Sequence, residues 1–436
     1  MATDVNPFHV RCLSHNHQYS HDNIQPLLHA APHHDGDIEF ELVFHVLSPL
    51  PGLEQATSQE IENHLHGLVQ SINSDFAGQA YNWDSGRTHQ PLFKSSKLLA
   101  KFIKQYGAEQ CPSRVSEIPT SELAASSNMS EHDLSSDPIW MYQTYLSLKA
   151  DTGIRFIHTG LQDRIHPQSG VGDRLHVLKL NDPAFASKVG SLVKMSENGG
   201  STAILNVLNI WIVDLPHQLL GFSSFVWDQA GPFDGVCVSN WVSGTKFAEH
   251  NGVDYRRYNL YHTFPHEIAH WLGLLHTFNQ DIAVDPLTHQ ARSKHQNDDF
   301  VSDTPDQDEA TQGNVLEHNH WPVDDRSDAL PYQFMNFMDY TNDHSMFMFT
   351  RGQRDRLRQV ALSCRGHQCT RRRRNGIDLD RDHERQGKQR DKKERPVARP
   401  LEPASFMSRI PVECMYNSFQ PSSSTWMQWF KSWSPW

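Results

Sequence analysis

Residues 266–276, which read HEIAHWLGLLH, constrain the fold more than any other part of the chain. On a helix, residues four apart lie on one face, about 5–6 Å apart at Cβ. The rings of His266 and His270 can therefore bind one Zn²⁺ ion through bonds of roughly 2.0–2.1 Å. Gly273 can adopt a positive φ and end the helix, which lets the chain turn back and bring His276 to the same ion. Three protein ligands leave the fourth position of the ion open, which is typical of a catalytic zinc site.

Glu267 follows the first of these histidines on the helix. It is too close in sequence to be a third ligand, but it is well placed to reach a water molecule at the ion. We predict that Glu267 is a general base, which takes a proton from the attacking water and passes it to the leaving group. The alternative is a surface helix with scattered histidines, because the chain has 28 of them. The fixed spacing of five residues favours the zinc site.

The pattern HExxHxxGxxH resembles that of the metzincin zinc peptidases, which also carry a methionine turn beneath the metal. Met338, in the segment 336–340, stands at the position of that turn. Other segments resemble one metzincin family, the pappalysins (peptidase M43, including its ulilysin-like members). These segments are 208–212, 271–278, 301–305 and 349–353. The resemblance covers residues 38–80 and 150–360.

This resemblance implies an α+β fold, a metzincin-type catalytic domain. A twisted mixed sheet, a backing helix and the zinc-binding active-site helix would lie over an irregular lower subdomain. The implied activity is that of a zinc-dependent metalloendopeptidase with one catalytic Zn²⁺ and with protein or peptide substrates. Two alternatives are a catalytically weak zinc-binding scaffold that recruits partners, and a zinc hydrolase of a non-protein amide. The intact Glu267 argues against the scaffold, which needs no general base.

Two residues of the methionine turn receive roles from the resemblance. Met338 would pack under the zinc ligands as an apolar, polarisable floor without binding the ion. Tyr340 stands where several metzincins place a tyrosine near the metal. We therefore expect Tyr340 to bind the oxyanion in the transition state, with plain packing as the alternative.

A calcium site is expected in the segment 298–304, which is dense in the oxygen ligands that Ca²⁺ prefers. Relatives bind structural calcium at the matching segment. By position, Asp299 and Thr304 would give side-chain or main-chain oxygens, and Asp298 and Val301 would give main-chain carbonyls. The alternative is an acidic surface loop.

Asp343 lies five residues after Met338, where the resemblance places the wall of the pocket beyond the scissile bond. In some bacterial relatives an aspartate there faces the pocket, and cleavage occurs before arginine or lysine. A carboxylate in a partly dry pocket can pair with a guanidinium in bidentate fashion. We expect a preference for Arg, then Lys, after the scissile bond. The alternative is that Asp343 caps a turn with Asn342 and faces solvent.

The six cysteines include no CxxC pair, so no zinc ribbon or thioredoxin-like site is indicated. Cys12, which follows Arg11, echoes an arginine–cysteine element that precedes the catalytic domain in relatives. Its thiolate could fill the open zinc position and restrain activity, and an unrelated cysteine is the alternative. Ser302 and Ser345 stand where relatives commonly have cysteines.

Three regions are predicted along the chain. Residues 1–37 resemble a pro-segment, residues 38–365 form the catalytic domain with an insertion at 80–150, and residues 366–436 form a basic, disordered tail. The segment 371–399 holds 12 Lys/Arg and 6 Asp/Glu, whereas the whole chain has a net charge of −12. An acidic body with a basic tail argues against nucleic acid as the main substrate.

Local patterns predict the elements around the motif. Alternating apolar residues predict a strand from Ile38 to Val46. Thr57 and Glu60 form a capping box for a helix that runs to Phe76. Apolar runs predict strands at 154–157, 204–213, 219–225 and 235–238, and Leu98 to Tyr106 reads as a helix. Because proline is tolerated in a first helical turn, Pro265 predicts that the zinc helix begins at about Phe264.

The compartment is left unassigned. No stretch approaches eighteen apolar residues, so no membrane span is expected. Residues 1–11 lack the apolar run of a conventional secretory signal. The family suggests secretion, whereas the missing signal and cysteines leave an intracellular location or another route of export open.

Overall fold

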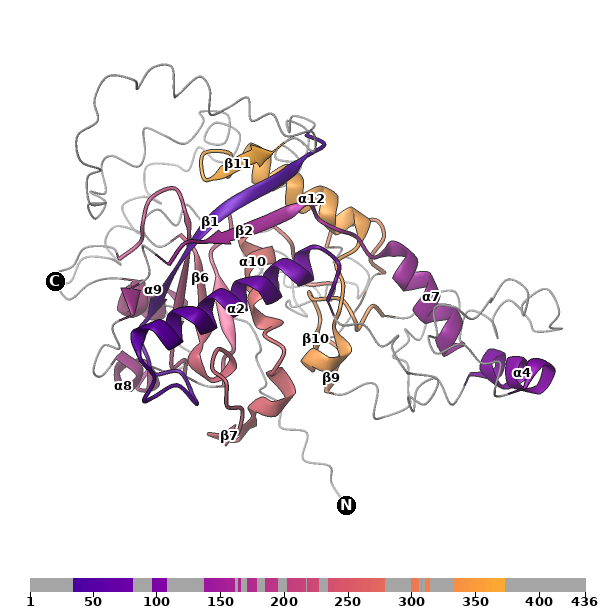
Figure 1. The fold of residues 1–436 in the computed structure, drawn as a ribbon, viewed down its shortest axis with the longest axis horizontal. Helices are drawn as coiled ribbons and strands as arrows, with labels where there is room; N and C mark the ends of the chain where they lie inside the picture. Colours follow the sequence, from indigo (N-terminus) through magenta and orange to yellow (C-terminus); the bar gives the residue numbers. More distant parts are fainter. Residues whose placement is uncertain are drawn as a thin grey trace, which may run out of the picture.

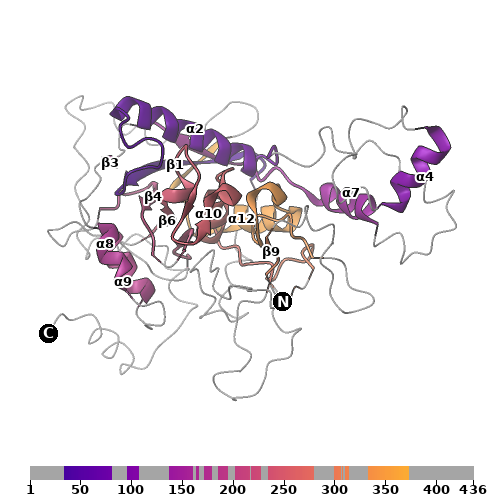
Figure 2. The same ribbon diagram turned by 90° about the horizontal axis from the view of Figure 1, so that it is seen from below.

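The computed structural model describes residues 34–80, 96–107, 137–160, 164–165, 171–178, 185–194, 202–216, 218–226, 234–278, 299–305, 307, 310–313 and 332–372. These residues form a mixed α+β body around one twisted sheet (Figures 1 and 2). The zinc helix lies on one face of the sheet, and the segments that follow it have little regular structure. The expected α+β class, with a mixed sheet over an irregular lower half, is confirmed.

The sheet has seven strands in the order β11-β1-β4-β6-β5, with β2 and β3 also paired to β1. Strand β1 is parallel to β2, β3 and β4, and β4 is parallel to β6. Strands β11 and β5 run antiparallel to their neighbours, and β5 has β6 as its only partner among the described strands. The strand bounds are β1 Asp37–Val46, β2 Ile154–His158, β3 Arg164–Ile165, β4 Leu208–Val213, β5 Gly221–Ser223, β6 Val236–Ser239 and β11 Cys369–Arg372.

Helices cover both faces of this sheet. Helix α2 (Ser58–Phe76) and helix α10 (Thr263–Trp271) pack on the face that carries the larger apolar core. Helix α8 (Val171–His176) and helix α9 (Phe185–Lys194) pack against the other face, on side chains that include Trp211 and Phe222. Figure 2 shows α2 on one side of the strands and α8 with α9 on the other. The zinc helix is thus buried between the sheet and the lower half.

The predicted capping box is confirmed at the start of α2. The Glu60 carboxylate accepts the Thr57 N–H at 2.7 Å, and the Thr57 hydroxyl accepts the Glu60 N–H at 3.3 Å. The apolar face of the helix, from Leu65 to Phe76, is buried against the sheet. This helix is the backing helix that was expected.

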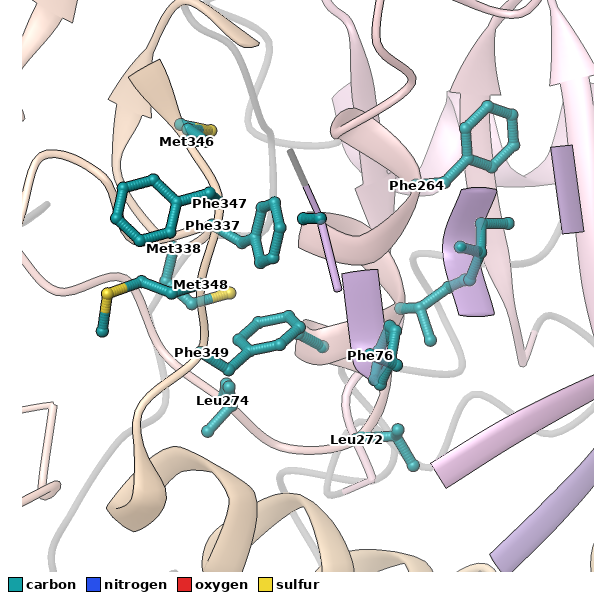
Figure 3. Packing of buried hydrophobic residues seen from close by; sticks show 14 of the residues in the cluster. Phe76, Phe264, Leu272, Leu274, Phe337, Met338, Met346, Phe347, Met348 and Phe349 are labelled. Atoms are coloured by element: carbon teal, nitrogen blue, oxygen red, sulfur yellow. The ribbon is translucent and has the colours of Figure 1, made fainter. Parts of the chain in front are cut away.

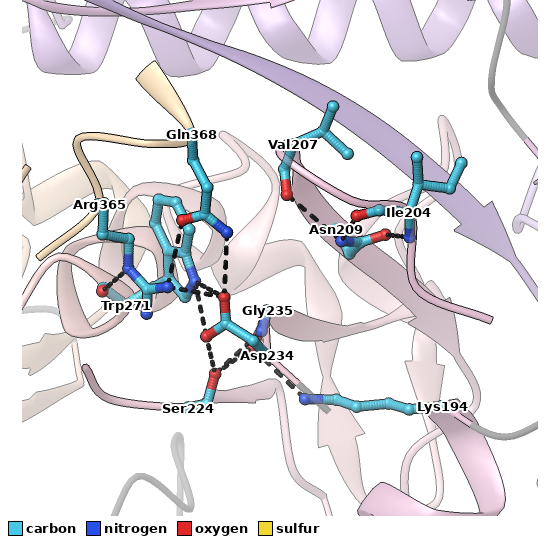
Figure 4. A network of polar contacts seen from close by, with 10 residues as sticks. All are labelled: Lys194, Ile204, Val207, Asn209, Ser224, Asp234, Gly235, Trp271, Arg365 and Gln368. Atoms are coloured by element: carbon cyan, nitrogen blue, oxygen red, sulfur yellow. Dashed lines mark hydrogen bonds and ion pairs between the residues drawn. The ribbon is translucent and has the colours of Figure 1, made fainter. Parts of the chain in front are cut away.

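Strand β4 begins later than the predicted residue 204. The side chain of Asn209 accepts the Ile204 N–H at 2.8 Å and donates to the carbonyls of Ile204 and Val207, so these residues close into a turn (Figure 4). Asn206 in the turn has a φ of 61°. The prediction placed the start of the strand too early because residues 204–207 are also mostly apolar. The turn that replaces the strand there is made by the side-chain amide of Asn209.

Among the described residues after α10, which make up the lower half, there are few regular elements beyond β9 (Gln312–Gly313), β10 (Tyr340–Thr341), the 3-10 helix η6 (Asp343–Ser345) and α12 (Arg351–Ser363). Its core is a cluster of aromatic and methionine side chains that packs against α2 and the end of α10 (Figure 3). The cluster includes Phe337, Met338, Met346, Phe347, Met348 and Phe349. Packing of these side chains, rather than backbone ladders, gives this region its order.

Within the predicted insertion, the structure describes helix α4 (Lys97–Tyr106) and helix α7 (Pro138–Leu148). The Asp137 carboxylate caps both helices, because it accepts the N–H groups of Leu98 and Ile139. Both helices extend away from the sheet (Figures 1 and 2). The domain boundaries themselves remain predictions. Among the described residues, no helix is both long and apolar enough to span a membrane.

Candidate metal centre

Helix α10 begins at Thr263, close to the predicted start, with Pro265 in its first turn. It ends in the turn that Gly273 makes with a φ of +85°. The Gly273 N–H donates to the His270 carbonyl at 2.8 Å, and the Leu274 N–H donates to the Ala269 carbonyl at 2.9 Å. These two bonds define a Schellman motif, which reverses the chain and leads it to His276.

The three predicted ligands meet behind this turn. The Nε2 atoms of His266, His270 and His276 lie 2.9–3.2 Å from one another, and all three residues are buried. The Nδ1 atom of His266 lies 2.6 Å from the Phe337 carbonyl, and that of His270 lies 2.8 Å from the Leu274 carbonyl. A ring nitrogen that faces a carbonyl must carry the proton, so Nε2 presents its lone pair in both rings.

The donor set fits a zinc ion. Two lone pairs that face each other in a buried space repel unless a cation lies between them. Burial lowers the pKa of His270 to about 4, against the opposing effect of its bond to Leu274, so this ring is neutral near pH 7, as a ligand must be. Tetrahedral bonds of roughly 2.0–2.1 Å place ligand atoms about 3.3 Å apart, close to the spacing of the three nitrogens. Among the described residues, this is the one place where three or more His, Cys, Asp or Glu side chains bring their ligand atoms close enough together to hold a metal.

Glu267 lies beside this cluster and is fully buried. It occupies the side of α10 that faces strand β5, where its side chain packs on the backbone of Gly221. The structure therefore places a buried carboxylate against strand β5, one residue after the first of the three histidines.

The methionine turn lies next to the three ligands. The carbonyl of Phe337 orients His266, and the Met338 carbonyl accepts the Thr277 N–H at 3.3 Å. Met338 is fully buried in the apolar cluster of the lower half (Figure 3). The Tyr340 ring centroid lies 5.0 Å from that of His276, so Tyr340 faces the ligand set.

Three of the four residues named for calcium come together, and Asp298 lies outside the described residues. The Asp299 carboxylate accepts the Val301 N–H at 2.9 Å and the Thr304 hydroxyl at 2.8 Å. The Arg356 guanidinium donates to the Asp299 carbonyl at 3.2 Å. The segment is therefore a closed turn with its oxygens gathered on one side, and it is tied to α12. Cys12 also lies outside the described residues.

Asp343 is fully buried, which contradicts the alternative in which it faces solvent. Its carboxylate accepts the N–H groups of Leu260 at 2.9 Å and His262 at 3.3 Å. The Nδ1 atom of His262 lies 3.0 Å from the Asp343 carbonyl. Asp343 thus ties the segment after the methionine turn to the start of the zinc helix.

A polar network at the other end of α10 was not predicted (Figure 4). The Arg365 guanidinium pairs with the Asp234 carboxylate at 2.6 Å, donates to the Trp271 carbonyl at 3.1 Å and lies 3.8 Å from the centroid of the Trp271 ring. The Trp271 N–H also donates to Asp234. The residues come from distant segments with no shared motif, so no spacing in the sequence reveals the network. It fixes the C-terminal end of the zinc helix.

Comparison with known proteins shows a family similarity over part of the chain. Residues 220–362 match the model of the peptidase M43 family, which is described as "Pregnancy-associated plasma protein-A". The matched segment includes the three histidines, Glu267 and Met338. Over this segment the chain is similar to the pappalysin family, in agreement with the resemblance seen in the sequence.

Curated relatives match parts of the chain. An "Extracellular metalloprotease" of Colletotrichum graminicola is 31% identical over 171 residues, which are 38% of this chain and 52% of that protein. One from Neurospora crassa is 37% identical over 106 residues, which are 24% of this chain and 32% of that protein. An uncharacterized protein of Acanthamoeba polyphaga mimivirus is 24% identical over 356 residues, which are 80% of this chain and 33% of that protein. The matches thus span about half or less of these relatives.

Solved structures of promirolysin and mirolysin from Tannerella forsythia are also similar to this chain. A promirolysin variant is 18% identical, with 80% of this chain and 88% of that chain covered and a TM-score of 0.49. Mature mirolysin in complex with a cleaved peptide is 20% identical, and the match covers 77% of this chain and 96% of that chain with a TM-score of 0.46.

We predict that the Asp234–Arg365 pair makes the fold sensitive to acid. Burial would raise the pKa of Asp234, but Arg365, Trp271 and Ser224 hold it below the ordinary value. A depressed pKa gives stability that is present above the unfolded pKa of about 3.9 and is lost as the pH falls through the folded value. Asp234→Asn should lower the free energy of unfolding at pH 7 by about 3–5 kcal/mol, because it leaves Arg365 buried without its counter-charge.

The measurement is the melting temperature of parent and variant between pH 3 and pH 7. The variant should have a lower melting temperature than the parent at pH 7, and its melting temperature should fall less between pH 7 and pH 3. Asp254→Asn is the matched control, since Asp254 pairs with Arg256 at the surface, where such pairs contribute about 0–1 kcal/mol. The prediction would be contradicted if the melting temperatures of Asp234→Asn and of the parent fell by the same amount between pH 7 and pH 3.

Proposed function

We propose that the chain is a zinc-dependent endopeptidase in which His266, His270 and His276 hold the ion and Glu267 is the general base. The observation that carries the proposal is the convergence of three Nε2 atoms beside a buried carboxylate. When bound, Zn²⁺ supplies a Lewis acid that increases the acidity of water and polarises the scissile carbonyl. The peptidase M43 match and the names of the fungal relatives support this activity.

The protein residues would then divide the remaining work. Glu267 takes the proton of the attacking water and returns it to the leaving amine. The carbonyls of Phe337 and Leu274 hold two imidazoles in the required tautomer and orientation. The hydroxyl of Tyr340, whose ring faces His276, donates to the oxyanion as it forms.

Strand β5 offers a place for the substrate. Among the described strands it is an edge strand of the sheet, and its backbone lies against Glu267. An extended peptide can pair with the outer edge of such a strand through main-chain hydrogen bonds. We propose that protein and peptide substrates bind in this way, with the scissile bond beside Glu267.

A basic preference after the scissile bond is proposed for Asp343. Its carboxylate is buried one helical turn from His266, beside His262. A carboxylate in such surroundings favours a cationic partner over an apolar one, and a guanidinium offers two parallel N–H donors. Arg would then be preferred after the scissile bond, with Lys second.

Two further proposals concern regulation and location. Cys12, next to Arg11 in a segment before the catalytic residues, would restrain activity by placing its thiolate at the open zinc position. Secretion is proposed because the fungal relatives are named extracellular metalloproteases.

We expect Glu267→Ala to retain one zinc ion per chain and to lose peptide hydrolysis by a factor of about 10²–10⁴, since general acid–base catalysis contributes that much. A His266→Ala/His270→Ala double variant should lose the ion. The measurements are metal analysis and mass spectrometry of a peptide library, with and without a chelator. Full zinc in the double variant would end the ligand assignment, and a zinc-loaded parent that cleaves nothing would favour the scaffold alternative.

We also propose that Asp299 and Thr304 supply oxygens to a structural Ca²⁺ ion, with main-chain carbonyls from Asp298 and Val301. The Asp299 carboxylate and the Thr304 hydroxyl already lie 2.8 Å apart. Millimolar Ca²⁺ should raise the melting temperature of the parent, because a ligand that binds only the folded state stabilises it. The shift should be absent in Asp299→Ala and absent with Mg²⁺, which demands a tighter octahedral site. Equal shifts with both ions would rule the site out.

For the specificity proposal, Asp343→Asn is the sharper variant, because an amide oxygen can still accept the N–H groups of Leu260 and His262. We expect the preference for Arg over an apolar residue after the scissile bond to fall at least tenfold, about 1.4 kcal/mol. The melting temperature and the cleavage of apolar peptides should stay near the parent's. A uniform loss on all peptides would show that Asp343 acts only in the fold.

A further inference from the structure

Gly221, the first residue of strand β5, lies in unusually close contact with Glu267. A Cβ atom placed on Gly221 would lie 2.7 Å from the Glu267 Cγ atom, 2.8 Å from its Oε1 atom and 3.0 Å from the carbonyl oxygen of Cys237. Cβ atoms are essentially never found within 3.0 Å of a heavy atom that lies outside their own residue and its chain neighbours. The φ of Gly221 is outside the left-handed region, so an alanine would be strained by contacts alone and not by its backbone.

Little around Gly221 can move to make room. The Cys237 carbonyl belongs to strand β6, which is buried and pairs with β5 along its length. The backbone of α10 is fixed at its end by the Gly273 turn and by the contacts of Trp271 with Arg365 and Asp234. Two of the three contacting atoms belong to the flexible Glu267 side chain and the third to the Cys237 backbone, so any side chain at position 221 must displace the Glu267 carboxylate.

We infer that Gly221 is a positioning residue for the general base: the absence of a side chain there creates the space in which the Glu267 carboxylate is held. The inference rests on the proposed peptidase function. It also links two parts of the site, because the strand proposed to pair with the substrate backbone would also locate the base. The height of the carboxylate above the strand would then set its distance from the scissile carbonyl.

The test is Gly221→Ala in the full chain. Displacement of a catalytic group by about 1 Å can cost 10²-fold, so kcat should fall about a hundredfold while KM and zinc content stay close to the parent's. Gly67→Ala is the control, because a Cβ on Gly67 meets no atom within 4 Å.

A second readout does not depend on activity. In the metal-free protein, Gly221→Ala should lower the melting temperature by about 3–6 °C, as overpacking does. In a Glu267→Ala background the same change should cost clearly less, because the two shortest contacts are absent and only the contact with the Cys237 carbonyl oxygen at 3.0 Å remains. Equal losses in both backgrounds, or a kcat within threefold of the parent, would overturn the inference. A zinc-loaded parent that cleaves no peptide would refute the proposed function, while the melting cycle would still report on the contact.

Discussion

The reversal of the chain at Gly273 is the constraint on which the metal centre depends. Without it, His276 would continue away from the helix and could not approach His266 and His270. The turn needs a residue with positive φ, and a Cβ there would also lie 2.9 Å from the Val360 side chain of α12. The absence of a Cβ atom at Gly273 therefore allows both the backbone turn and the close approach of α12.

The lower half achieves its order with side chains instead of regular ladders. Asn336 and Gln353 exchange hydrogen bonds beneath the methionine turn. Asp339 accepts N–H groups from Gln307, Thr311 and Tyr340, although burial raises its pKa to about 6. Such polar networks specify one conformation only when their members are satisfied. This explains how a region whose described residues form few regular elements holds the Phe337 carbonyl at the His266 ring.

Features set by local spacing could be predicted from the sequence, and features set by distant contacts could not. The zinc motif, the Thr57 capping box and the start of α10 depend on residues within a few positions of one another. The Asp234–Arg365–Trp271 network joins three segments far apart in the chain, and the burial of Asp343 depends on the loop before α10. Nor could the sequence show how Asn209 shortens its strand. The resemblance supplied roles for Tyr340, Asp343 and the calcium residues, which remain predictions.

The bond between the His266 ring and the Phe337 carbonyl links the stability of the lower half to the presence of the metal ion. His270 takes its orientation from the Leu274 carbonyl in the turn itself, whereas His266 is oriented by a residue 71 positions downstream. An ion bound by His266, His270 and His276 would connect the zinc helix to the lower half, and loss of the ion would weaken the attachment of the segment that carries Phe337. An endopeptidase with this construction would digest its own metal-depleted copies first, so that the surviving population is enriched in loaded molecules.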